Sequence, residues 1–197
     1  MARQSLDFIA AELAESLEVL TAAAQSEAFA RQIEAIASAI ILSLHEGGKV
    51  LFAGNGGSAA DAQHIAGEFV SRLNYDRAPL AGLALTTDTS VLTAIGNDYG
   101  YEQVFARQVA GLGRPADVFV GISTSGHSRN ILAALAVARE KGLRTIGFTG
   151  ADGGPMAGYS DLLLNAPSRR TPMIQQLHIT AAHIICGLVE SALCPKG

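Results

Sequence analysis

The stretch VLFAGNGGSAAD at residues 50–61 is the clearest indication of the fold, because a short apolar run passes through a glycine-rich turn into a helical pattern. Glycines let the backbone turn tightly and approach a ligand, and the start of a helix presents free N–H groups to an anion. The stretch lacks the Gly-Lys-Ser/Thr ending of a nucleoside-triphosphate P-loop. It matches the weak dinucleotide fingerprint Gly-x-Gly-x-x-Ala, but neither Asp76 nor Asp88 ends the next strand, where such a site needs an acidic residue. A phosphate-binding turn and a turn without a ligand remain open.

The rest of the chain alternates short apolar runs with helical patterns. The apolar runs that predict strands occupy residues 50–53, 80–85, 118–122, 145–148 and 161–164. The helical patterns occupy residues 59–73, 89–112 with a break near Gly100, 129–141 and 172–193. Because parallel neighbouring strands need a crossover, usually a helix, this alternation predicts an α/β fold, a three-layer α-β-α sandwich around a five-stranded parallel sheet. Ligands of such sheets bind beyond the carboxyl ends of the strands.

Residues 4–45 have apolar positions at helical spacing and predict two helices that meet near Gln25 and Ser26. Because this region carries few basic residues and many carboxylates, it does not resemble the basic helices that read DNA. We expect it to serve packing or oligomerisation. Length and composition favour a single domain over 1–197, made of a helical segment at 1–46 and an α/β core at 47–197.

The composition argues against nucleic acid and membranes as partners. With 197 residues, 49% hydrophobic content and a net charge of −4, the chain lacks the basic excess that binds phosphate backbones. Its N-terminus carries charges within a helical pattern, unlike a signal peptide, and we expect no run of membrane-spanning length. These features predict a cytoplasmic protein. Cys186 and Cys194 fit neither a disulfide framework nor a thiolate metal site, so we expect two reduced packing residues.

A second polar loop follows the apolar run at 118–122. Its sequence STSGHS, residues 123–128, places four hydroxyl groups directly before a helical pattern. Hydroxyl donors, backbone amides and the helix dipole can surround a phosphate monoester without any cation. The alternative is a polar loop in which Ser128 only caps the following helix. The turn at 149–154 is expected to be structural.

Titratable residues gather on the helix after the first turn. His64 and Glu68 are four residues apart and so project from one face, with Asp61 one turn earlier. Neutral imidazole and carboxylate oxygens are normal zinc ligands. An exposed polar pair has the same spacing, so the spacing alone does not specify a metal.

The last predicted helix carries two glutamines and two histidines among apolar residues at helical spacing: Gln175, Gln176, His178 and His183. A histidine in such a place is more often a packing residue than a ligand. Gln175 and His183 are separated by about 12 Å of helix rise, so both side chains of one copy would have to stretch to meet at one ion. We therefore expect a site assembled between subunits.

Together these segments resemble the sugar isomerase (SIS) family, and within it the branch that acts on sedoheptulose 7-phosphate. The resemblance covers essentially the whole chain. The matching segments are residues 54–64 with Glu68, then 96–98, 123–128, and Ile174-Gln175 with His183. The resemblance implies a flavodoxin-like sheet and a homotetramer with active sites at the subunit interfaces.

The resemblance also implies a set of site residues. A divalent metal, zinc, would be held once per subunit by His64, Glu68, Gln175 and His183. Substrate contacts would fall on Asn55, Gly56, Gly57, Ser58, Glu68, Asn97, Asp98, Ser123, Thr124, Ser125, Ser128 and Gln175. The family selects Gln175, whereas periodicity alone favours Gln176. His127 replaces an asparagine of the family, and Pro172 stands where some relatives carry an acidic residue.

The implied reaction converts sedoheptulose 7-phosphate to D-glycero-D-manno-heptose 7-phosphate through an enediol. It would be the first step toward nucleotide-activated heptose for lipopolysaccharide or capsule. An aldose–ketose isomerisation needs one proton carrier at carbon and one at oxygen. Our hypothesis is that Glu68 abstracts the carbon-bound proton, that His183 serves the oxygen as acid, and that metal charge stabilises the enediolate.

Three other classes of protein differ from this one in specific features. A non-catalytic SIS protein that binds the bacterial replication initiator would lack the acidic residue at 68 and the second histidine, so Glu68 and His183 favour the enzyme. A sugar-phosphate-sensing regulator would carry a DNA-binding domain, which the acidic N-terminal region does not resemble. A dinucleotide-dependent oxidoreductase would bind its cofactor in a titration.

Overall fold

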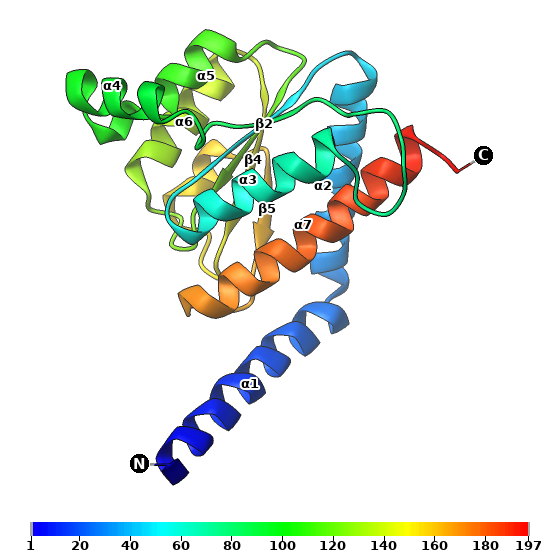
Figure 1. Cartoon of the computed structure of the whole chain (residues 1–197), viewed down its shortest axis with the longest axis vertical. Coiled ribbons are helices and arrows are strands. Elements are labelled where there is room, and N and C mark those ends of the chain that lie inside the picture. Colours follow the sequence, from blue (N-terminus) through cyan, green and yellow to red (C-terminus); the bar gives the residue numbers. More distant parts are fainter. Residues whose placement is uncertain (1, 197) are drawn as a thin grey trace.

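The computed structural model describes residues 2–196, with side chains from Gln4 onward. The helices are α1 (Ala2–Gln25), α2 (Glu27–His45), α3 (Gly57–Val70), α4 (Thr89–Tyr99), η1 (Tyr101–Gln103), α5 (Ala106–Leu112), α6 (Arg129–Glu140), η2 (Gly154–Tyr159) and α7 (Thr171–Leu193). The strands are β1 (Val50–Gly54), β2 (Gly82–Ala84), β3 (Val118–Ile122), β4 (Arg144–Thr149) and β5 (Leu162–Asn165). Figure 1 shows a layered body from which α1 extends.

The strands form one parallel sheet in the order β2-β1-β3-β4-β5, which confirms the predicted five-stranded sheet. β1 pairs with β2 on one side and with β3 on the other, so the winding direction reverses between β1 and β3. In this flavodoxin-like order, ligands bind outside the carboxyl ends of the strands at the reversal point. The glycine-rich turn after β1 and the serine-rich loop after β3 both lie at that edge.

Alternate strand residues enter two separate cores, because successive side chains of a strand point to opposite faces. Phe52 and Val120 point toward α2, α3 and α7, whereas Leu51 and Phe119 point toward α5 and α6. The sheet is therefore covered on both faces. The predicted three-layer α-β-α arrangement is confirmed.

The two N-terminal helices meet at Ser26, whose hydroxyl accepts a hydrogen bond from the Phe29 N–H and caps α2. α2 packs into the core on the sheet, but α1 projects away from the body (Figure 1). On one side of α1, Arg170 donates hydrogen bonds to Glu12 and Glu15. The large apolar residues that α1 exposes are Leu6, Phe8, Ile9, Leu13 and Leu17.

Several boundaries differ from the sequence prediction for tertiary reasons. α3 begins at Gly57, two residues early, because Gly56 adopts a positive φ of 56° that turns the chain into the helix. It ends at Val70 rather than 73, since the Leu73 N–H binds the distant carboxylate of Glu190 instead of a helix carbonyl. β2 is shortened to Gly82–Ala84 at the edge of the sheet. The short helix η2 was not predicted at all.

α7 corrects the expectation that no run reaches membrane-spanning length. Within residues 2–196 it is the one helix long and apolar enough to cross a membrane by length and composition. Half of its most apolar part is buried inside the protein. Ile174, Leu177 and Ile185 belong to the core between α7 and the sheet, so burial accounts for the apolar sequence.

Candidate active site

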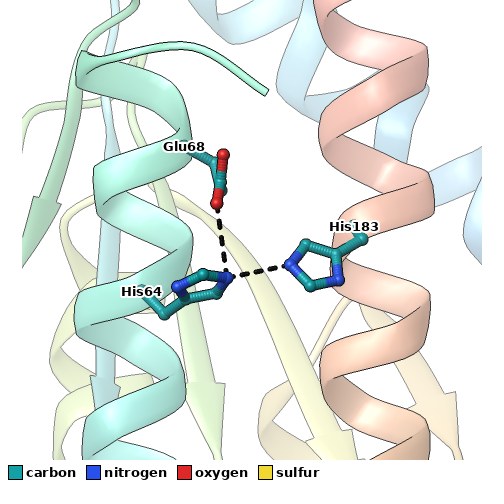
Figure 2. Close-up of side chains that lie close together, drawn as sticks. All are labelled: His64, Glu68 and His183. Atoms are coloured by element: carbon teal, nitrogen blue, oxygen red, sulfur yellow. Dashed lines mark hydrogen bonds and ion pairs between the residues drawn. The ribbon is translucent and has the colours of Figure 1, made fainter. Parts of the chain in front are cut away.

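Three titratable side chains converge between α3 and α7. His64 Nε2 lies 2.8 Å from His183 Nε2 and 3.3 Å from Glu68 Oε1. Figure 2 shows His64 and Glu68 projecting from α3 toward His183 on α7. About half of the His64 side chain is exposed, while Glu68 is 17% exposed, so the cluster is accessible from solvent on its His64 side.

The convergence occurs within one copy of the chain, which corrects the expectation that these side chains need a second subunit to meet. α3 and α7 lie side by side and run in the same direction (Figure 1). Gly57 at the start of α3 is beside Gln175, and Leu73 just after α3 is bound by Glu190. The expected difficulty of reach concerned Gln175 and His183, which both lie on α7, and Gln175 lies beside Gly57 at the start of α3.

Gln175 and Gln176 point to different neighbours. A Cβ atom added at Gly57 would come within 2.5 Å of Gln175 Nε2, so Gln175 lies against the first turn of α3. Gln176 Oε1 instead accepts a hydrogen bond from the Ser16 hydroxyl of α1 at 2.7 Å. Gln175 therefore faces the glycine-rich turn, and Gln176 faces α1.

Asn55 in the glycine-rich turn is held by an amide pair that sequence reasoning missed. Its Nδ2 donates to Asn130 Oδ1 at 2.9 Å, and Asn130 Nδ2 donates back to Asn55 Oδ1 at 2.8 Å. The Tyr101 hydroxyl also donates to Asn55 Oδ1 at 3.1 Å. Asn130 is buried at the start of α6, so it ties the turn after β1 to the helix that follows the serine-rich loop. In the sequence, the one indication of this role was the amide of Asn130 at the start of an otherwise apolar helical pattern.

The serine-rich loop is organised by its own hydroxyls. Ser123 Oγ donates to Ser128 Oγ at 2.9 Å, and Ser128 makes no side-chain capping bond to α6. Ser128 is the N-cap residue of α6, but its side chain binds Ser123 rather than the helix. Ser125 Oγ accepts a hydrogen bond from the His127 N–H, and the loop borders a cavity of about 260 Å³ that Thr124 and Ser125 help to line.

The turn after β4, residues 149–154, packs against this loop, in agreement with the structural role expected of it. Gly126 has a φ of 68°, and a Cβ atom there would meet the Gly153 carbonyl oxygen at 2.3 Å. The Gly150 N–H donates to the Thr124 carbonyl at 3.1 Å. The two backbone segments therefore pack so closely that only glycine fits at 126.

Asn97 and Asp98 lie at the exposed end of α4, where Asn97 Nδ2 donates to Asp98 Oδ1 at 2.8 Å. Neither belongs to the cluster of His64, Glu68 and His183. The chain turns at Gly100 just beyond them, and Tyr101 then reaches Asn55. Through this contact, the end of α4 is connected to the glycine-rich turn.

The convergent side chains fit a divalent metal. Their donor atoms all lie within 4.8 Å of one another, and imidazole and carboxylate are standard zinc donors. Tetrahedral zinc bonds of about 2.0–2.1 Å hold ligand atoms about 3.3 Å apart, so the two imidazoles would separate by about half an ångström. The donor atoms of Glu68 and His183 lie within 4.8 Å of each other and would approach by up to about 1.5 Å, so side-chain adjustments of this size would complete a metal site.

The other titratable groups of α7 and its surroundings have structural environments. Burial lowers the pKa of His178 to about 4 and outweighs the opposing effect of its hydrogen bond to the Thr149 carbonyl. His178 is thus a neutral packing residue. Burial raises the pKa of Cys186 to about 12, and Cys186 and Cys194 are both unpaired. Cys186 is buried, as expected of a packing residue, whereas Cys194 is half-buried.

Asp61 lies one turn before His64 and does not join the cluster. Burial raises the pKa of its carboxyl, and the neighbouring His64 only partly opposes this effect. Within residues 2–196, its buried Oδ2 has no hydrogen-bond partner.

Comparisons with known proteins agree with this fold. The SIS domain family model matches residues 12–150. The phosphoheptose isomerase of Burkholderia pseudomallei (strain 1710b) is 54% identical over 196 residues, which span 100% of both chains. A solved phosphoheptose isomerase from Neisseria gonorrhoeae superimposes with a TM-score of 0.88 at 44% identity, covering 94% of this chain and 98% of that one. Another from Francisella tularensis gives 0.91 at 36% identity, covering 95% and 98%. The chain therefore belongs to the SIS domain family and, within it, to the phosphoheptose isomerases.

Proposed function

We propose that this enzyme converts sedoheptulose 7-phosphate to D-glycero-D-manno-heptose 7-phosphate in the crevice where β1 and β3 end. The observation that carries this proposal is the convergence of Glu68 with His64 and His183 between α3 and α7. Full-length relatives named phosphoheptose isomerase support the substrate class. The product would enter nucleotide-activated heptose synthesis for lipopolysaccharide or capsule.

The phosphate group would bind at the start of α3 and at the serine-rich loop. The N–H groups of an α-helix start attract anions, and hydroxyl donors add hydrogen bonds without adding charge. The loop groups proposed to hold the phosphate are Ser58, Ser123, Thr124, Ser125 and Ser128. The groups proposed to contact the sugar are Asn55, Gly56, Gly57, Glu68, Asn97, Asp98 and Gln175.

The spacing between these loops and the cluster suits a long sugar phosphate. Gly57 and His64 are separated by about 10 Å of helix rise, because each residue adds about 1.5 Å. A seven-carbon sugar bound by its terminal phosphate at the start of α3 can extend along the helix toward Glu68. Its carbonyl end would then lie at the titratable side chains.

Glu68 and His183 would carry the two proton transfers. The Glu68 carboxylate takes the carbon-bound proton beside the carbonyl, and His183 gives or receives the proton at oxygen. His64 lies within hydrogen-bonding distance of His183 and 3.3 Å from Glu68, so it holds both groups in one orientation. This division gives each proton its own carrier.

We also propose that His64, Glu68, Gln175 and His183 hold a divalent metal, zinc, once per subunit. Such an ion, when bound, supplies positive charge that stabilises an enediolate. Gln175 lies beside Gly57 at the start of α3, so its amide would have to extend along α7 to join the other three. The imidazole and carboxylate donor set supports zinc.

A homotetramer and a cytoplasmic location complete the proposal. The exposed apolar residues of α1 support assembly, because a patch of apolar side chains this large is costly to leave in water and commonly marks a protein interface. The two unpaired cysteines support a reducing compartment. The non-catalytic initiator-binding alternative is not favoured, because Glu68 and His183 are both present and converge.

The test is to incubate the zinc-loaded protein with sedoheptulose 7-phosphate and follow formation of the aldose by NMR. Glu68→Gln should lower kcat by about 10²- to 10⁴-fold, since it removes the proton acceptor while keeping the side-chain shape. Glu140→Gln, at an exposed position of α6, is the matched control and should keep the wild-type rate. Wild-type turnover by Glu68→Gln or His183→Ala, with the fold checked by circular dichroism, would show that the roles are wrong.

A further inference from the structure

Arg77 and Glu190 form a buried ion pair directly beyond the convergent cluster. Arg77 Nε donates to Glu190 Oε1 at 3.0 Å, and the two side chains are only 4% and 1% exposed. The reaction proposed above uses neither residue. Two buried charges are costly unless their hydrogen bonds are satisfied, so the contacts of this pair indicate what it holds in place.

Arg77 holds the C-terminal end of α3. Its terminal nitrogens donate to the carbonyl oxygens of Glu68 at 2.7 Å and of Phe69 and Ala78 at 2.9 Å each. One of these carbonyls belongs to the backbone of Glu68 itself. The guanidinium therefore fixes the backbone from which the proposed proton acceptor projects.

Glu190 holds the same region from α7. Its carboxylate accepts hydrogen bonds from the N–H groups of Leu73 at 3.0 Å and Asn74 at 2.9 Å, in addition to Arg77. Burial acts to raise the pKa of Glu190, but these hydrogen bonds prevail and lower it below its ordinary value. Glu190 follows His183 by seven residues, about two helical turns, so both side chains project from the same side of α7.

We infer that Arg77 and Glu190 are positioning residues, and that their ion pair sets the distance between α3 and α7 at which Glu68, His64 and His183 form a metal site. This inference rests on the proposed metal site. Replacing a buried ion pair by apolar residues of similar volume often leaves a fold equally stable, so the attraction between the two charges does not by itself explain this pair. Directed hydrogen bonds, unlike apolar contacts, specify one spacing and one orientation of the two helices.

The chain contains a matched control in a second buried carboxylate, Asp117, which pairs with Lys49. Asp117 is buried, accepts the N–H groups of Lys49 at 3.0 Å and Arg114 at 2.8 Å, and pairs with Lys49 Nζ at 2.6 Å. Like Glu190, it is a buried carboxylate with two backbone donors and one cationic partner. It lies before β3, at the amino end of the strand, and so has no contact with the cluster.

The experiment compares Glu190→Gln with Asp117→Asn in the full-length protein. Each is titrated with Co²⁺ alone, followed by visible absorption, and the melting temperature of the metal-free protein is measured in parallel. Glu190→Gln should weaken Co²⁺ binding by about tenfold or more, the size of effect seen when groups that orient metal ligands are lost. Asp117→Asn should lower the melting temperature comparably and change the Co²⁺ affinity by less than about twofold. His183→Ala should abolish binding.

Arg77→Lys is the second variant, used if Glu190→Gln does not fold. It keeps the positive charge but cannot make all the bonds to Glu68, Phe69 and Ala78, so it should also weaken Co²⁺ binding. Equal effects of Glu190→Gln and Asp117→Asn on affinity, or wild-type affinity in both variants of the pair, would overturn the inference and leave the metal site standing. Wild-type protein that binds no Co²⁺ at His183 would remove the metal site and the inference with it.

Discussion

Asn55 has its side-chain oxygen occupied by two donors, Asn130 Nδ2 and the Tyr101 hydroxyl. One N–H of Asn55 Nδ2 donates to Asn130. The geometry of this amide pair therefore fixes the direction in which the second N–H of Asn55 points. Asn130 thereby orients a residue proposed to contact the sugar, although it was not among the residues singled out in the sequence.

Asn130→Ala should raise KM for sedoheptulose 7-phosphate by about five- to tenfold with a smaller change in kcat, because one lost hydrogen bond is worth about 1 kcal/mol in binding orientation. Tyr101→Phe, which removes only the third contact to Asn55, should have a smaller effect on KM. Steady-state kinetics of the two variants measures both changes in KM. A folded Asn130→Ala enzyme with wild-type KM would contradict the positioning role.

His178 makes the stability of the protein depend on pH. Its pKa is lowered from 6.5 to about 4 in the folded chain, so between these values only the unfolded chain binds the proton. The contribution of neutral His178 to the free energy of unfolding is therefore fully present above pH 6.5. It is lost as the pH falls toward 4, and the loss amounts to about 3 kcal/mol in total. Denaturant unfolding between about pH 7 and about pH 4 should show a shallower decline in His178→Gln than in wild type. Parallel curves for the two proteins would refute this assignment.

At the scale of helices, the site depends on which elements lie side by side. Periodicity predicts that α3 and α7 exist, and the i,i+4 spacing correctly puts His64 and Glu68 on one face. It does not show that α7 brings His183 to within 2.8 Å of His64, a contact between residues 119 positions apart. Likewise, the end of α3 at Val70 follows from the bond of Leu73 to Glu190, which no local pattern reveals.

The prediction about assembly concerns α1. We expect Leu13→Glu combined with Leu17→Glu to reduce the proposed tetramer to smaller species, because both leucines are 66% exposed in the single chain and charges there would oppose burial. Sedimentation equilibrium measures the change. Glu18→Gln, at an exposed polar position on the same helix, should leave the assembly intact. A wild-type protein that is monomeric at every concentration would exclude the tetramer.

At the scale of the whole molecule, we propose that the chain unfolds as one unit, since α2, α3 and α7 share one core with the sheet. Calorimetry of the metal-free protein should show a single transition. Zinc at about 100 times its dissociation constant should add about 2.7 kcal/mol to the unfolding free energy, because it binds only the folded site. His64→Ala should remove the shift caused by zinc and keep the single transition. Two separate transitions would divide the chain into independent units.

Residue patterns in the sequence were enough to predict the fold class, most of the elements and the position of both polar loops. These features depend on side-chain periodicity and on the backbone freedom of glycine, which act over a few residues. The resemblance of the motifs also indicated which side chains to examine. Only the tertiary structure decided that one chain suffices to bring Glu68, His64 and His183 together, that Asn130 holds Asn55, and that Arg77 and Glu190 join α3 to α7. The physical reason is that these contacts join residues far apart in the chain, and packing of the helices on the sheet, rather than local preference, sets their distances.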